Sequence, residues 1–321
     1  MNALAPLPVL IACCAVAQAA IQTEFPWSKD IPADIARQFV EPTQFIDEKP
    51  CDWRAQVQAI FLPLIKDCTT AEQAVQAIAP NMGKLTGVYY SVERSSACLN
   101  PEQSLREKKA SCTGLSILFA AAMRSVGIPA RLVGVLSWNH TPGNHTWTEL
   151  WFDGAWHMIE FDQSEYNTPW VMDAISMLDT TQWSQRVMAL CPEAPAASMN
   201  FFPLPWNIAN HDVRAEDVSA RYMQLARDWY ATQDRPANKQ ELMIDLLPRQ
   251  DKERKVQLCD ASGTVLDEGS LPKPSDDMRQ MLKLYLPKTG QGYTLRFPDG
   301  SHMPITVTDA PVQVLRFKRK P

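Results

Sequence analysis

The chain carries, in order, a cysteine, a histidine and a pair of carboxylates, the side chains that form thiol active sites. Cys112 stands in KKASCTGLSILFAAAMRSVGIPARLVG, His145 opens HTWTELWF, and Glu160 and Asp162 close AWHMIEFD. A nucleophilic cysteine reacts as the thiolate and needs a base, usually a histidine that a carboxylate or amide orients. These residue types therefore predict attack of a thiol on a carbonyl carbon.

We expect Cys112 in the first turn of a buried helix. Ser111 is a suitable N-cap, apolar residues then recur on one helical face, and Gly127 and Pro129 end the pattern. The unpaired amides and the dipole at a helix start favour a thiolate. Taken alone, Cys112 is equally compatible with a disulfide or with a small core residue, because cysteine is among the most buried residue types.

The histidine and the carboxylates fall on a predicted β-hairpin. Asp153 and Gly154 separate the two strand-like stretches and form the strongest short-range hairpin signal. In that register Asp162 lies directly opposite His145, and Glu160 is its diagonal neighbour on the same face. Opposed Cβ atoms are about 4.5–5.5 Å apart and diagonal ones about 7–8 Å, so either carboxylate can reach the imidazole.

The stretches SCTGLSILFAAAMRSVGIPARLVG and NHTWTELWFDGAWHMIEFD resemble the transglutaminase-like superfamily of papain-like thiol enzymes. The resemblance covers roughly residues 70–170 and implies that Cys112 is the nucleophile and His145 the general base. The family usually has Asp at the position of Glu160, so family spacing favours Glu160 as the third member, whereas residue type and hairpin register favour Asp162. The backbone N–H of Cys112 is the expected oxyanion donor.

Two further residues are candidates for the cleft. Asn81 is a possible side-chain donor to the oxyanion from an upstream helix. Trp147 is a possible part of an aromatic binding wall, although packing on the face of the sheet explains it equally well. Neither assignment follows from spacing.

The elements around these residues are predicted from local signals. We expect helices at 52–61 and from 71, the second with Thr69 or Thr70 in a capping box, and another at 215–233. The stretch 87–93 is strand-like, 94–109 reads as a solvated loop, and 130–138 is a strand. Residues 163–210 show weak periodicity and are expected to wrap the core irregularly.

The fold class is α+β: a Cys-bearing helix packed on an antiparallel sheet, with a small C-terminal all-β domain. The expected order is a signal peptide (1–19), an N-terminal lead-in (20–50), a transglutaminase-like domain (51–212), a helix and linker (213–239) and a β-sandwich-like module (240–321). The last segment alternates strand-like runs with turns at Ser262-Gly263 and Asp299-Gly300.

The N-terminal 20 residues contain no charged side chain and end in a small-x-small pattern at Ala17 and Ala19, as secretory signal peptides do. We therefore expect an exported protein, periplasmic, extracellular or attached to the cell surface. Leu10 to Cys13 resembles a bacterial lipobox, so a lipid anchor on Cys13 is the alternative. Export permits disulfides, and Cys51 with Cys68 is a candidate pair.

The composition excludes several classes of function. The chain has 321 residues, 45% hydrophobic and 21% charged, with a net charge of −5. No basic field invites nucleic acid, the apolar N-terminal run is too short for a comfortable membrane span, and no metal or nucleotide motif is present. We expect neither a cofactor nor a metal.

The predicted function is a cysteine-dependent hydrolase or acyltransferase that cleaves peptide or amide bonds through a thioester, a peptidase or amidase rather than a cross-linker. Its expected partner is a peptide or protein substrate. The alternatives are a non-catalytic transglutaminase-like module that binds protein or glycan, and an acyltransferase that uses a thioester cofactor.

Overall fold

The structure is a computed structural model that describes residues 25–139, 143–195, 200–232, 238–274, 281–289, 292–308 and 312–318. Its contacts divide the chain into two units, Met1–Trp229 and Tyr230–Pro321. The expected signal peptide and lipid-anchor cysteine lie outside the described residues. Within the described part, no helix combines the length and the apolar character that a membrane crossing requires.

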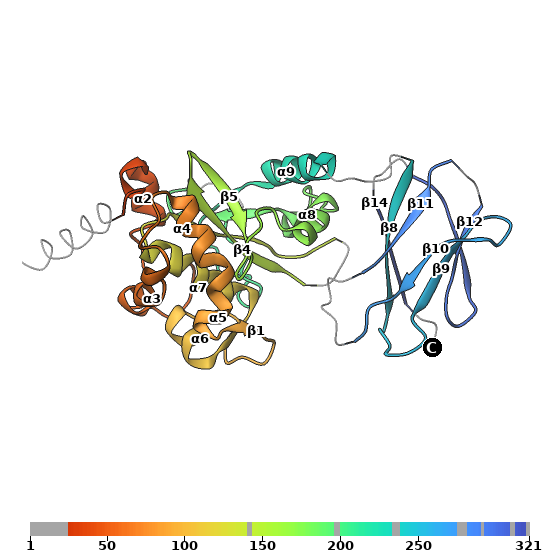
Figure 1. The fold of residues 1–321 in the computed structure, drawn as a ribbon, viewed down its shortest axis with the longest axis horizontal. Helices are drawn as coiled ribbons and strands as arrows, with labels where there is room; N and C mark the ends of the chain where they lie inside the picture. The colour runs from red at the N-terminus through yellow and green to blue at the C-terminus, as the bar shows by residue number, and fades with distance from the viewer. Residues whose placement is uncertain are drawn as a thin grey trace, which may run out of the picture. The chain divides into compact units, whose positions relative to one another are not determined.

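The first unit is built around α7 (Cys112–Ser125), the predicted Cys-bearing helix. Ser111 caps it, and every residue after Cys112 is buried. Figure 1 shows α3 to α6 gathered around this helix. The other helical elements are η1 (Ser28–Asp30), α2 (Ala33–Phe39), α3 (Arg54–Phe61), η2 (Leu62–Leu64), α4 (Ala71–Ile78), η3 (Ala79–Asn81), α5 (Met82–Thr86), α6 (Pro101–Glu107), α8 (Pro169–Ser176), η4 (Trp183–Gln185) and α9 (Ser219–Thr232).

A five-stranded antiparallel sheet lies against α7, in the order β5-β4-β3-β6-β7. Its strands are β3 (Ala130–Val135), β4 (His145–Phe152), β5 (Ala155–Ile159), β6 (Met188–Leu190) and β7 (Ala215–Asp217). A short parallel pair, β1 (Tyr89–Tyr90) and β2 (Lys109–Ala110), immediately precedes α7. The expected Cys-bearing helix on an antiparallel sheet is confirmed.

Side chains alternate between the two faces of this sheet, and both faces are buried. Leu132 and Leu150 join the core that contains α7, whereas Val133 and Trp147 join a second core that contains residues of α8 and α9. The sheet is therefore a central layer, and successive side chains of β4 pack in different cores.

The predicted hairpin forms with the expected register. Asp153 and Gly154 have φ values of 50° and 75°, as a two-residue type I′ turn requires. Glu149 pairs with Met158, and Thr148 with Ile159. The second strand, however, ends at Ile159, before both candidate carboxylates.

Two segments predicted as irregular contain regular elements. The expected loop at 94–109 includes α6, which Asn100 starts through a capping box with Gln103. The expected irregular wrap at 163–210 contains α8 and β6, and β6 pairs with β3 inside the sheet. The sequence did not predict β6 because a three-residue strand has no readable period and forms only through long-range pairing.

After the end of α9, the described residues of the second unit form strands joined by turns and loops, and the expected all-β C-terminal region is confirmed. One sheet has the order β10-β9-β12-β13 and the other β11-β8-β14. Leucines of both sheets, such as Leu242 and Leu246 in β8 and Leu258 in β9, share one core. The strands are β8 (Lys239–Leu247), β9 (Lys255–Cys259), β10 (Val265–Ser270), β11 (Leu282–Pro287), β12 (Tyr293–Arg296), β13 (His302–Ile305) and β14 (Val312–Lys318).

Candidate active site

Cys112 is the first residue of α7, as predicted. The Ser111 hydroxyl accepts the Gly114 N–H at 3.0 Å and donates to the Ala97 carbonyl at 2.6 Å, so the helix start is held on both sides. The first amides of a helix have no intrahelical acceptor and carry positive potential. The half-buried Cys112 sulfur therefore lies where a thiolate is favoured.

Buried hydroxyls bind the start of α7 to β4. Thr113 Oγ1 and Thr146 Oγ1 are 3.0 Å apart, and Ser116 Oγ donates to the carbonyls of Cys112 and Thr146 at 2.8 and 2.9 Å. These bonds link the helix to the residue that follows His145. Sequence reasoning missed them, although small polar residues on one turn of an otherwise apolar helix were a readable signal.

The imidazole of His145 connects Cys112 with Glu160. His145 Nε2 lies 2.6 Å from Glu160 Oε1, and the thiol of Cys112 is hydrogen-bonded to His145. Because Nε2 is occupied by the carboxylate, Nδ1 is the ring nitrogen left for the sulfur. Both partners are shielded from solvent, with 6% of the His145 side chain and 14% of the Glu160 side chain exposed.

The electrostatics favour a thiolate–imidazolium pair. Burial raises the pKa of the Cys112 thiol, but the hydrogen bond and charge of His145, the Thr146 N–H and the Thr113 hydroxyl together lower this pKa to about 7. Burial lowers the pKa of His145, and its bonds to Cys112 and Glu160 outweigh that effect and raise the pKa above its usual value. Each group of the pair thus favours the charged form of the other.

Three tryptophans surround the imidazole. The Trp147 ring stacks on it at 5.8 Å, the Trp170 ring meets it edge-on at 4.6 Å, and the Trp138 ring lies 6.4 Å away. Trp170 Nε1 also donates to Glu160 Oε2 at 2.8 Å. Sequence reasoning did not find Trp170, because the segment that carries it was predicted to be irregular.

The structure chooses between the two carboxylates. Glu160 binds the imidazole, whereas Asp162 has turned into the left-handed region at φ 61° and accepts the Gly83 N–H at 3.0 Å. The predicted position of Asp162 opposite His145 is wrong because β5 ends at Ile159 and the chain turns away. Asp162 instead holds the end of the hairpin against α5.

The structure decides between the two readings of Trp147 and gives one bond of Asn81. The Asn81 amide donates to the Ala77 carbonyl at 2.9 Å, a bond along its own helical segment. Trp147 is only 1% exposed and lies beneath the imidazole, so it packs the core and cannot line an open binding wall. Its indole N–H donates to the Tyr222 hydroxyl at 2.6 Å.

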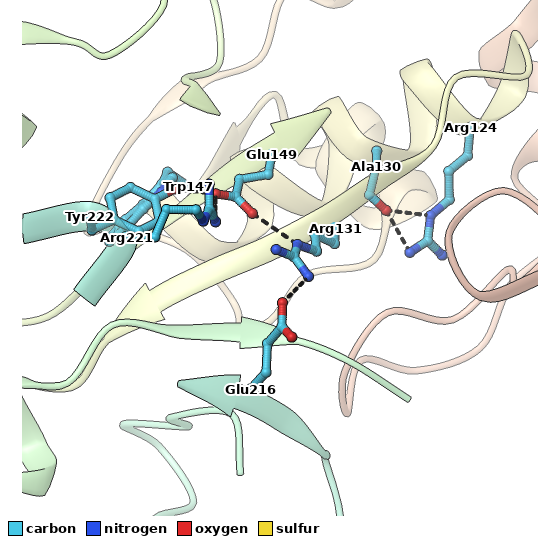
Figure 2. Close-up of polar contacts among 8 residues, drawn as sticks. All are labelled: Arg124, Ala130, Arg131, Trp147, Glu149, Glu216, Arg221 and Tyr222. Atoms are coloured by element: carbon cyan, nitrogen blue, oxygen red, sulfur yellow. Dashed lines mark hydrogen bonds and ion pairs between the residues drawn. The ribbon is translucent and has the colours of Figure 1, made fainter. Parts of the chain in front are cut away.

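A buried ionic network surrounds Glu149, which lies two residues after Trp147 on the same face of β4 (Figure 2). Glu149 accepts Arg131 Nε at 2.8 Å and the Tyr222 hydroxyl at 2.7 Å, and it pairs with Arg221. Arg131 also binds Glu216, at 2.6 Å. Through Tyr222, this network supports the indole of Trp147 on which His145 stacks.

The described cysteines are free thiols: Cys51, Cys68, Cys98, Cys112, Cys191 and Cys259. The expected disulfide between Cys51 and Cys68 is therefore wrong for this structure. Each of the two sulfurs is half-buried against the core of the first unit.

The sequence comparison identifies the domain that carries this site. Residues 59–161, which include Cys112, His145 and Glu160, match the family model of the transglutaminase-like superfamily. The match identifies this segment as transglutaminase-like. No curated protein matches the sequence.

Two solved structures are similar to the chain. A candidate cysteine protease from Cytophaga hutchinsonii is 18% identical, with a TM-score of 0.33, over 42% of this chain and 44% of its own. A red sea bream transglutaminase is 9% identical, with a TM-score of 0.36, over 88% of this chain and 66% of its own. The chain spans less than two thirds of the length of either structure.

Proposed function

We propose that this chain is a cysteine-dependent hydrolase that cleaves peptide or amide bonds through a thioester on Cys112. The observation that carries the proposal is the contiguous set Cys112, His145 and Glu160, in which the thiol pKa is lowered to about 7. A thiol that only fills a core is inert and has its pKa raised by burial, as is the case for Cys98.

In the proposed reaction the Cys112 thiolate attacks the carbonyl carbon, and the carbonyl π electrons move to oxygen. The Cys112 backbone N–H and the positive end of α7 stabilise this oxyanion. As the intermediate collapses, the C–N bond breaks and the His145 imidazolium gives its proton to the leaving nitrogen. The products of this half-reaction are a free amine and an acyl-thioester on Cys112.

Water completes the cycle. The neutral imidazole takes a proton from a water molecule, the hydroxide attacks the thioester carbon, and the thiolate leaves as the acid product forms. Glu160 keeps the imidazole oriented and stabilises its charged form throughout. Hydrolysis is preferred over transfer to an acceptor amine because water needs no second binding site.

Alkylation by iodoacetamide as a function of pH tests the nucleophile without a substrate. Peptide-resolved mass spectrometry should show that Cys112 reacts with a midpoint near pH 7. Cys68 is the matched internal control, since it is also half-buried and its pKa is raised by burial and by Asp67. His145→Ala should move the Cys112 midpoint upward and leave Cys68 unchanged.

A Cys112 midpoint near the ordinary thiol value of about 8.5, unaffected by His145→Ala, would favour a non-catalytic binding module. Given a reactive thiol, peptide libraries incubated in ¹⁸O-labelled water divide the remaining alternatives. Hydrolysis incorporates the label into the new carboxylate, whereas transfer to an added amine yields an unlabelled amide.

A further inference from the structure

Trp170 contacts two members of the candidate site at once. Its Nε1–H donates to Glu160 Oε2 at 2.8 Å, while Oε1 of the same carboxylate binds His145 Nε2 at 2.6 Å. Its ring meets the imidazole edge-on, with the centroids 4.6 Å apart and the planes at 69°. Each oxygen of Glu160 is therefore held by a different ring nitrogen.

We infer that Trp170 is a positioning residue for the Cys112–His145–Glu160 site: its indole N–H orients the carboxylate, and its ring covers the imidazole. The inference rests on the proposed function, because positioning matters only if the thiol reacts. It adds a fourth side chain, from α8, to Cys112, His145 and Glu160.

The need for a second donor follows from the residue type at position 160. A glutamate has one more rotatable bond than an aspartate, and its terminal torsion is broad, so one hydrogen bond does not fix the plane of its carboxylate. A second donor on the other oxygen fixes that plane and keeps Oε1 directed at His145. It also satisfies an acceptor that is largely removed from water.

The ring contributes separately from the N–H. An apolar ring in edge-on contact with the imidazole limits the access of water to the bond between His145 and Glu160, and an electrostatic interaction is stronger in a drier environment. The ring edge and the N–H belong to one rigid side chain, so the position of the carboxylate and the cover of the imidazole are set together.

The local fold determines where the indole lies. Asn167 adopts φ 55°, and its N–H donates to the Met158 carbonyl at 3.1 Å, which returns the chain to β5 directly after the hairpin. Pro169 then occupies the first position of α8, where its fixed φ suits a helix start. Trp170 follows on the first turn of α8 and faces Glu160.

The experiment compares Trp170→Phe with Trp206→Phe. Phenylalanine keeps an aromatic ring at position 170 but lacks the N–H donor. Trp206 is the matched control, because its Nε1 also donates to a carboxylate, that of Asp47, at 3.0 Å. The readout is the iodoacetamide reaction of Cys112 against pH, with thermal unfolding recorded for each variant.

We expect Trp170→Phe to raise the midpoint of Cys112 alkylation by roughly half to one pH unit and so to slow alkylation at pH 7 about two- to fivefold. Trp206→Phe should leave both values unchanged, whatever its effect on thermal unfolding. In a Glu160→Ala background, Trp170→Phe should have no further effect on the midpoint, because its role passes through that carboxylate.

The outcomes separate the inference from the function on which it rests. An ordinary, His145-independent midpoint in the unaltered protein overturns the proposed function. A low, His145-dependent midpoint that Trp170→Phe leaves in place overturns only the inference, as does an additive effect in the Glu160→Ala background.

A measurement on the unaltered protein covers the case in which Trp170→Phe does not fold. The ¹H–¹⁵N resonance of the Trp170 indole, assigned by selective labelling, should shift with the same pH midpoint as Cys112 alkylation. A resonance that stays constant across that range overturns the inference.

Discussion

The β4–β5 hairpin carries Glu149 within β4 and Glu160 directly after β5, and the partners of these two carboxylates differ in kind. Glu149 is fully buried and is bound by Arg131, Arg221 and the Tyr222 hydroxyl. Glu160 is 14% exposed and bound by His145 and Trp170. The first carboxylate has partners whose charge is fixed at ordinary pH, and the second has a partner whose charge changes.

Within one hairpin, the partners of Glu149 suit a structural role, whereas those of Glu160 suit proton transfer. Burial raises the pKa of Glu149, but the two guanidinium groups and the Tyr222 hydroxyl lower it below the usual value, so the network stays charged. A group that never changes its protonation state cannot exchange protons with a substrate. The pair of His145 and Glu160 can, since an imidazole gains and loses a proton and its bonds to Cys112 and Glu160 raise the pKa of His145 above the usual value.

The largest expected effect is on activity and concerns His145, the partner of Glu160 whose charge changes. His145→Ala removes both the base and the partner of the thiolate, so kcat should fall by at least about 10³-fold. Chemical denaturation should show a much smaller change in stability than that loss of activity implies. A variant that retains more than a tenth of the activity would contradict the assignment of His145.

The next largest effect concerns Glu149, whose arginine partners keep a fixed charge, and it is an effect on stability. Glu149→Gln leaves the buried Arg131 without its main counter-charge and should lower the free energy of unfolding by about 3–5 kcal/mol. Glu216→Gln is the matched control, because Glu216 binds the same arginine but is 46% exposed. Its cost should stay below about 1 kcal/mol. Equal costs for the two variants would contradict the contrast between fixed and titrating partners.

Glu160→Gln should show the reverse pattern from Glu149→Gln. Loss of the carboxylate charge weakens the imidazolium, so kcat should fall by about 10²-fold while stability changes by less than about 1.5 kcal/mol. Asp162→Asn serves as the comparison and should retain activity within about twofold, since its oxygen can still accept the Gly83 N–H. A larger loss for Asp162→Asn would reinstate that residue as the third member.

As pH falls, the protein should lose activity before it unfolds. The folded-state pKa of Cys112 is lowered from 9.0 to about 7, so the thiolate is lost as pH falls through 7. The pKa of Glu149 is lowered from 4.5, so its stabilising contribution is present above 4.5 and is lost only as pH falls through the still lower folded value. Between these values, circular dichroism should show a folded protein that regains activity on return to neutral pH.

On the alkaline side the limit is set by histidine. The pKa of His145 is raised above 6.5, so the imidazolium and its stabilising interactions are fully present below 6.5 and are lost as pH rises through the folded value. The rate of the first half-reaction should therefore rise as the thiolate forms, pass through a maximum and fall again as the imidazolium is lost. A rate that rises steadily to the pKa of an ordinary thiol would contradict the ion pair.

Local signals explain what the sequence allowed us to predict. Ser111 as N-cap, the turn at Asp153 and Gly154, and the capping box of Thr70 with Gln73 all depend on a few adjacent residues, and each forms as expected. The register of the hairpin then follows from its turn. Cys112, His145 and Glu160 could be predicted because the N-cap and the hairpin turn locate α7 and the β4–β5 hairpin, which position them.

Long-range partners explain what could not be predicted. The sequence left Trp147 open between a binding wall and packing on the sheet, because its position depends on a bond to Tyr222, 75 residues away. The strands β6 and β7 contain three residues each and exist through pairing with distant chain. Asp162 was misplaced because the expected hairpin register was extended beyond Ile159, where β5 ends.

The dependence of Cys112 on neighbours from separate elements has a consequence for the life of the chain. In an unfolded polypeptide its thiol has the ordinary pKa of about 8.5, and on the order of 3% is ionised at pH 7. Docking of α7 on β4 brings the imidazole, the Thr146 N–H and the Thr113 hydroxyl to the sulfur and raises that share to about half. The Cys112 thiolate thus becomes a major species at neutral pH only when these elements are folded together.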